Sequence, residues 1–139
     1  MPITDVQLGV ISQWECAKLL IMGSGGLIEI AGSLTDDDRR DYEIHVRGQY
    51  GLALALQIKS TKRLRRRNGA ANYLRVDFDV RATRLVDNPY FWYFVSYMDP
   101  TLMRNADPVF IVSSADFHRL ANPKRHGEFW RLTMEASMD

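Results

Sequence analysis

The spacing of apolar residues changes at a glycine-rich run, Gly-Ser-Gly-Gly at 23–26, and this change restricts the fold more than any other feature. Before the run, apolar residues recur at three- and four-residue steps, the period of a helix with one buried face. The pattern predicts a helix over 4–22, with Thr4 as its N-cap and Asp5 at the positive end of its dipole. Its expected buried stripe consists of Val6, Val10, Ile11, Trp14, Ala17 and Ile21.

After the run, apolar and polar residues alternate, which is the period of a half-buried strand. Strands are expected over 27–34, 42–46 and 52–59, with an acidic turn at 36–38 between the first two. The short connections favour antiparallel pairing. The three strands are therefore predicted to form a meander packed on the first helix.

The rest of the chain continues with strands and short helices. Further strands are expected over 72–79, 90–98 and 108–113, a short helix or turn over 81–86, a helix over 115–120 capped by Ser114, and an edge strand over 128–134. The strongly aromatic segment 90–98 is interpreted as a buried strand rather than a base-stacking platform. This order predicts an α/β or α+β fold, a mixed sheet flanked by helices, in a single domain over 1–139.

Composition excludes several classes of protein. The net charge is +1, so nucleic-acid binding requires a local basic patch rather than overall basicity. One cysteine, Cys16, excludes an internal disulfide and, with three histidines, a cysteine-rich zinc site. The chain shows no signal-peptide pattern and no apolar run of about 18 residues, the length of a membrane span. A cytoplasmic protein without membrane contact is expected.

The expected third strand, over 52–59, has polar residues near its C-terminal end. Both faces of this strand carry apolar or small residues, which indicates burial on both faces. Gln57 and Lys59 lie near its end, where a buried lysine needs a partner or a wet cleft. Asp41 begins the neighbouring strand, so a carboxylate, an amide and an ammonium are expected to meet at one rim of the sheet.

Asp41, followed after a hairpin by Gln57-Ile58-Lys59 and Ser60-Thr61, resembles the PD-(D/E)XK nuclease superfamily. The pattern is similar to the branch whose strand reads Gln-x-Lys-Ser-Thr, which includes methyl-directed restriction endonucleases and small bacterial relatives. The resemblance in element order covers roughly 5–120. It implies a restriction-endonuclease-like fold and an endonuclease (a hydrolase) that uses Mg²⁺ or Mn²⁺.

The resemblance also implies roles for individual residues. Asp41, the Ile58 carbonyl and the Gln57 amide oxygen would bind the metal, since Mg²⁺ prefers oxygen ligands. Lys59 would orient and help deprotonate the attacking water, or stabilise charge on the phosphate. Glu15 on the first helix would hold a water of the metal's coordination shell.

Several alternatives accompany these assignments. Asp38 is the fallback metal ligand, Glu15 is otherwise a solvated ion-pair partner, and His45 is interpreted as a packed residue. Arg40 replaces the family's proline, and Gln57 replaces an acidic residue and so removes a negative charge from the metal site. The alternative function is therefore a catalytically weak or silent module on the same fold, which binds nucleic acid or a protein.

A basic loop follows the third strand. Its cationic residues are Lys62, Arg63, Arg65, Arg66 and Arg67. Arginine binds phosphate oxygens in a bidentate manner, so the loop is expected to hold a nucleic-acid backbone, DNA first, without reading sequence. A solvated face or a site for an acidic protein is the alternative. Because so short a chain has little room for a separate target-recognition domain, a homodimer, a partner protein or the structure of the DNA is expected to supply specificity.

Overall fold

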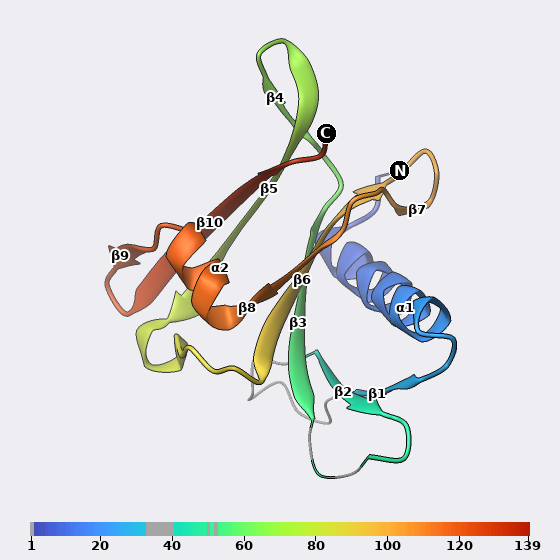
Figure 1. Cartoon of the computed structure of the whole chain (residues 1–139). Coiled ribbons are helices and arrows are strands. Elements are labelled where there is room, and N and C mark those ends of the chain that lie inside the picture. Colours follow the sequence, from blue (N-terminus) through green and yellow to red (C-terminus); the bar gives the residue numbers. More distant parts are fainter. Residues whose placement is uncertain (1, 33–40, 50, 52) are drawn as a thin grey trace.

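The computed structural model describes residues 2–32, 41–49, 51 and 53–139. Over these residues the fold is mixed α+β, with two α-helices and ten strands in two sheets (Figure 1). The elements are α1 (Asp5–Gly23), β1 (Ile28–Gly32), β2 (Tyr42–Val46), β3 (Leu54–Thr61), β4 (Arg65–Arg67), β5 (Ala70–Arg81), the 3₁₀ turn η1 (Ala82–Arg84), β6 (Phe91–Asp99), β7 (Arg104–Asn105), β8 (Phe110–Ser113), α2 (Ser114–Leu120), β9 (Lys124–His126) and β10 (Phe129–Ser137). The expected fold class is confirmed.

The ends of α1 follow from its terminal residues. The Thr4 hydroxyl accepts a hydrogen bond from the Gln7 N–H at 3.1 Å, and the Gln7 side chain accepts one from the Thr4 N–H at 2.9 Å. This reciprocal pair is a capping box. Beyond the last helical residue, Gly26 has a φ of +82°, a conformation that favours glycine. The helix predicted over 4–22 is thus confirmed to within a residue at each end.

The buried face of α1 differs from the predicted one. Leu8, Ser12 and Cys16 face the sheet, and Cys16 packs against Leu56 and Phe94. The prediction of the core stripe was therefore wrong. Its members lie on the outer side of the helix: Val6, Val10, Trp14 and Ile21 are exposed, and Ile11 and Ala17 are half-buried.

Small and polar residues explain why the pattern missed this face. The Ser12 hydroxyl hydrogen-bonds the Leu8 carbonyl at 2.7 Å and also the hydroxyl of Ser60 on β3. A serine satisfied in this way can be buried without the cost of an unpaired polar group. Hydrophobic periodicity counts Ser12 as polar and therefore selects the wrong side of the helix.

The first sheet has the order β1-β2-β3-β6-β7, with β8 also paired to β6. The three leading strands form the predicted antiparallel meander, and β6 lies parallel to β3 on the far side. Tyr93, Phe94 and Val95 in β6 are fully buried, which confirms the buried strand predicted over 90–98. The acidic turn at 36–38, with Asp38, and the neighbouring Arg40 lie outside the described residues.

The second sheet has the order β4-β5-β10-β9 and was not separated from the first by the sequence pattern. Two predictions about the segments of this sheet were wrong. The basic segment is not only a loop, because Arg65–Arg67 pairs with the start of β5 as a strand. The C-terminal strand is not at an edge, because β10 lies between β5 and β9 (Figure 1).

The side chain of His118 joins the short helix α2 to β6 and to the segment that precedes β6. The Tyr93 hydroxyl lies 2.8 Å from His118 Nε2, and His118 Nδ1 lies 2.6 Å from a carboxylate oxygen of Asp87. Ser113, rather than the predicted Ser114, is the N-cap, because its hydroxyl accepts the Asp116 N–H. The predicted turn over 81–86 contains η1.

Two hydrophobic clusters lie on opposite sides of the first sheet. One joins α1 to the sheet through Cys16, Leu56 and Phe94. The other joins β5, β10 and α2 to β6 around Tyr93 and Phe117. In the described part of the chain, neither helix is long and apolar enough to span a membrane.

Candidate functional site

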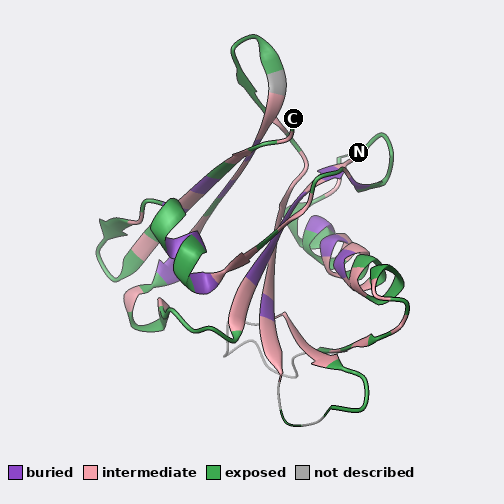
Figure 2. Cartoon of the chain, viewed as in Figure 1, coloured by how far each residue is buried: buried purple, intermediate pink, exposed green. Residues whose placement is uncertain are grey.

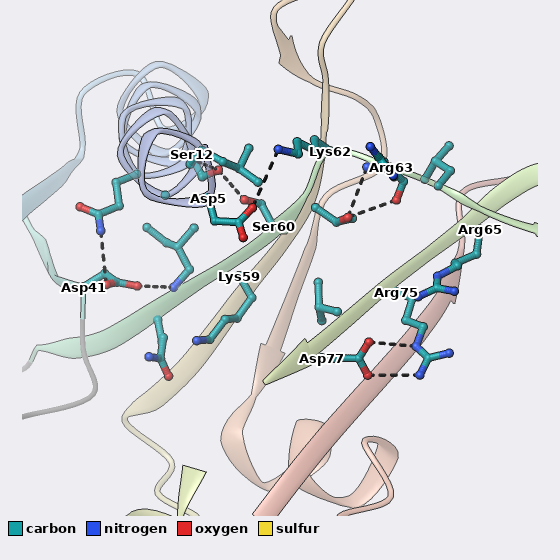
Figure 3. A pocket seen from close by; sticks show the side chains of 18 residues that line it. Asp5, Ser12, Asp41, Lys59, Ser60, Lys62, Arg63, Arg65, Arg75 and Asp77 are labelled. Atoms are coloured by element: carbon teal, nitrogen blue, oxygen red, sulfur yellow. Dashed lines mark hydrogen bonds and ion pairs between the residues drawn. The ribbon is translucent and has the colours of Figure 1, made fainter. Parts of the chain in front are cut away.

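A cleft of about 820 Å³ lies between the N-terminal half of α1, the C-terminal half of β3 and the base of the β4–β5 hairpin (Figure 3). Its walls come from segments far apart in the sequence. The polar and charged residues that line it include Asp5, Gln13, Asp41, Gln57, Lys59, Lys62, Arg63, Arg65, Arg75 and Asp77, and Ile58 lies among them. The cleft therefore gathers the residues predicted for metal binding and catalysis, apart from Glu15, beside part of the basic segment.

Asp41 is held against the edge of β3 just before β2 begins. Its backbone N–H donates to the Leu56 carbonyl at 2.8 Å, and its carboxylate accepts the Ile58 N–H at 2.7 Å. Gln13 from α1 approaches the other carboxylate oxygen at 3.4 Å. The Asp41 carboxylate is thus positioned by two elements at the rim of the cleft.

The same edge of β3 exposes a backbone oxygen. In a strand, the N–H and C=O of one residue point to the same side. Because the Ile58 N–H points to Asp41, the Ile58 carbonyl also faces this edge, beyond the last pair of the β2–β3 ladder at Tyr42 and Leu56. Gln57, whose side chain lies on the opposite face from Leu56, lines the cleft as well.

Lys59 extends from β3 toward the second sheet. Its Nζ lies 4.2 Å from the centroid of the Phe78 ring on β5, a cation–π distance. Figure 3 shows the side chain between Asp41 on one side and the Arg75–Asp77 pair on the other. The strand predicted to be buried on both faces is half-buried apart from Leu56, which is buried. The aromatic ring and the open polar cleft therefore allow an ammonium group to remain at its end.

The basic segment divides into residues with different surroundings. Lys62 donates to the Ile3 carbonyl at 2.6 Å, and Arg67 stacks on Tyr73 at 4.6 Å from the ring centroid. Arg63 and Arg65 are exposed and line the cleft. The remaining member, Arg66, is exposed on β4 and does not line the cleft.

Strand β5 adds an ion pair that the sequence pattern did not identify. Arg75 Nε lies 3.1 Å from Asp77, which also accepts a hydrogen bond from the Thr133 hydroxyl at 2.5 Å. Burial raises the pKa of Asp77, but the hydrogen bonds from Thr133 and Arg75 and the charges of Arg75 and Arg131 lower it below its usual value. Asp77 is therefore a carboxylate at neutral pH and leaves Arg75 less free to bind an anion.

Glu15 does not lie in the cleft. It forms an ion pair with Lys18 at 2.9 Å and lines a different hollow beside Arg104. The α1 residue beside Asp41 is Gln13, two positions earlier, because the helix turns its Leu8–Ser12–Cys16 side to β3. His45 is also absent from the cleft lining and lies 3.7 Å from Glu43.

The donor atoms at Asp41 suit a hard cation. One carboxylate, one amide oxygen and one backbone carbonyl form an all-oxygen set, and Mg²⁺ commonly takes one or two carboxylates and completes its shell with water and phosphate. Within the described residues, no three His, Cys, Asp or Glu side chains gather as a metal-binding group. A Mg²⁺ ion held by this set would need water or phosphate oxygens to complete its coordination shell.

Cys16 lies on the buried face of α1, near Asp41, and its burial predicts low reactivity. The thiol is fully buried, and burial, followed by the negative charge of Asp41, raises its pKa to about 12. Because the thiolate is the reactive species, we expect the native protein not to react with a thiol reagent at neutral pH. After unfolding, one thiol per chain should react with the reagent. Rapid stoichiometric labelling of the native protein would contradict this packing.

Compared with known protein families, curated proteins and solved structures, the chain gives no match. The site is therefore interpreted from its own residues and geometry.

Proposed function

We propose that the protein is a metal-dependent endonuclease that hydrolyses phosphodiester bonds in DNA, as the resemblance to the PD-(D/E)XK superfamily implies. The supporting observation is the cleft in which Asp41, Gln57, the Ile58 backbone and Lys59 lie together beside Arg63 and Arg65. Carboxylate and carbonyl oxygens suit a divalent cation, and guanidinium groups suit phosphate.

The chemistry can be divided among the residues of the cleft. Asp41, with the Gln57 amide and the Ile58 carbonyl, would hold Mg²⁺, which supplies Lewis-acid stabilisation of charge on the phosphate when bound. Lys59 would orient the attacking water and offset negative charge as the new P–O bond forms and the bond to the leaving oxygen breaks. The contact with Phe78 fixes the direction of its ammonium group.

The β4–β5 hairpin supports DNA as the substrate. It projects beyond the rest of the fold, and its tip is a two-residue turn at Asn68 and Gly69 with φ angles of +51° and +82° (Figure 1). A two-stranded ribbon fits the major groove of B-form DNA, whereas the major groove of duplex RNA is too narrow. Arg65 and Arg66 on this ribbon would contact the backbone next to the cleft.

The alternative is a nucleic-acid-binding module without catalysis, or a module that binds an acidic protein. Gln57 is neutral, and Asp41 supplies the one carboxylate among the three expected ligands. This reduces the charge that attracts a cation. Binding without cleavage, in the presence of Mg²⁺ or Mn²⁺, would favour this alternative.

The test of the proposed function is cleavage of linear, nicked and branched DNA with Mg²⁺ or Mn²⁺ and with a chelator. We expect products only with the metal, and none from the Asp41→Asn protein. Equal cleavage by the native and Asp41→Asn proteins would identify a contaminating nuclease and contradict the proposal. Because Cys16 is unpaired, a reducing compartment, the cytoplasm, is the location we propose for this activity.

Removing the hairpin arginines should weaken DNA binding without affecting folding. For the double variant Arg65→Ala/Arg66→Ala, we expect binding to fall about tenfold or more and the slope against log salt to decrease by about one per lost phosphate contact. The measurement is fluorescence anisotropy over a salt series. Arg119→Ala, on α2 and paired with Asp116, is the matched control and should bind as the native protein does. Equal losses in both proteins would indicate binding by general charge.

A further inference from the structure

The outer side of α1 is exposed in the described fold (Figure 2), and its most exposed residues are largely apolar. Val6 and Trp14 are 79% and 69% exposed, and Val10 and Ile21 are 43% and 41% exposed. With Ala17, these residues follow one side of the helix at four- and three-residue steps. We call this surface, Val6, Val10, Trp14, Ala17 and Ile21, the outer stripe.

The outer stripe contains no charged residue. The charged residues of α1 are Asp5, Glu15 and Lys18; Asp5 lines the cleft, and the other two pair with each other. Soluble proteins keep contiguous apolar patches small unless they form an interface. The stripe that the sequence pattern assigned to the core is therefore available for burial against another molecule.

We infer that the outer stripe binds the same stripe of a second copy, with the two helices antiparallel about a two-fold axis. The stripe is self-complementary in this arrangement. With the axis between Gln13 and Trp14, Val6 lies opposite Ile21 of the other copy, and Val10 lies opposite Ala17. Both contacts join apolar residues, and Trp14 lies next to the axis, where it meets Trp14 of the other copy.

The area is consistent with a reversible dimer. The stripe exposes roughly 400 Å² per copy, and with the flanking side chains Gln7 and Lys18 the pair would bury on the order of 1,000 Å², near the lower limit for a specific interface. Antiparallel helix dipoles also attract each other. A membrane surface suits the stripe less well, because interfacial helices carry several basic residues and α1 carries one, Lys18.

Dimerisation through α1 would leave the cleft of each copy accessible. Leu8 and Ser12 line the cleft from the side of α1 that faces the sheet, opposite the outer stripe, so the dimer contact would lie away from the cleft. The proposal does not rest on endonuclease activity, since it follows from the exposed stripe alone.

Sedimentation equilibrium from micromolar to sub-millimolar concentration tests the dimer. We expect a reversible monomer–dimer equilibrium that Trp14→Glu weakens about a hundredfold or more, as loss of a buried tryptophan at an interface does. Leu120→Glu is the matched control, because Leu120 is 57% exposed and lies on α2, on the opposite side of the first sheet from α1. A native protein that stays monomeric throughout, or a dimer that Trp14→Glu leaves intact, would overturn the proposal.

Disulfide cross-linking tests the antiparallel register and does not depend on how Trp14→Glu folds. Val10→Cys and Ala17→Cys proteins, one of them tagged, should form a mixed disulfide dimer when oxidised together. Val10→Cys alone should not, because two copies of this position would be about 10 Å apart along the helix axes. Cys16 is buried and adds no background. Cross-linking of Val10→Cys to itself, without the mixed product, would overturn the antiparallel arrangement.

Discussion

Replacing Lys59 with alanine is expected to lower the rate of DNA cleavage by about 10²- to 10³-fold while leaving DNA binding within a few-fold of the native value. The lysine lies in the cleft beside Asp41, and its charge would matter most when negative charge develops on the phosphate. The exposed arginines would provide the electrostatic attraction that binds the substrate. Single-turnover cleavage and anisotropy on the same duplex measure the two quantities separately.

The control is Glu15→Gln, which removes a charge from α1 outside the cleft and should cleave at the native rate. Asp41→Asn completes the set, because asparagine retains an oxygen that can accept the Ile58 N–H but loses the charge for Mg²⁺. A Lys59→Ala protein with native cleavage would remove Lys59 from the mechanism. If the Glu15→Gln protein cleaved DNA as slowly as the Lys59→Ala protein, Glu15 would take part in the mechanism.

Replacing Phe94 with alanine should destabilise the protein by about 3–5 kcal/mol, through lost apolar burial and the cavity left behind. Phe94 is fully buried in β6 and packs with Cys16 and Leu56, where α1 meets the sheet. The loss is a large fraction of the roughly 5–15 kcal/mol that stabilises a typical domain. Urea unfolding followed by circular dichroism measures it.

Phe129→Ala is the matched control for this prediction. Phe129 starts β10 and is 37% exposed, with Arg81 5.3 Å from its ring centroid. We expect a loss below about 1.5 kcal/mol, since the site is open to solvent and the ring contact is at the surface. Equal destabilisation by the two substitutions would contradict the packing around Phe94.

Local chemistry made much of the fold predictable. Thr4 and Gln7 determine where α1 begins, and the glycine run determines where it ends. Alternation along the chain predicted the meander and the buried β6 strand. The juxtaposition of Asp41 with Gln57 and Lys59 was also foreseeable, because a short hairpin joins their strands and fixes which ends meet.

The residues that the sequence analysis missed come from nonlocal contacts. Strand β10 pairs with β5 from Phe129 opposite Arg81 to Ser137 opposite Tyr73, so residues 48 to 64 positions apart share one ladder. Nothing in the local pattern of β5 indicates that Arg75 and Asp77 face the cleft rather than solvent. That orientation results from the packing of the second sheet on β6.

By itself, the sequence determined the ends of α1, the period of the strands and the oxygen-rich motif at Asp41 and Gln57, because capping, side-chain alternation and short turns depend on neighbouring residues. Tertiary structure decided which face of α1 is buried, that Gln13 rather than Glu15 meets Asp41, and that two sheets form. The physical reason is that a surface becomes buried only where a second surface packs against it. Ser12 is buried because Ser60 lies opposite it, and the outer stripe is exposed because no described element lies opposite it.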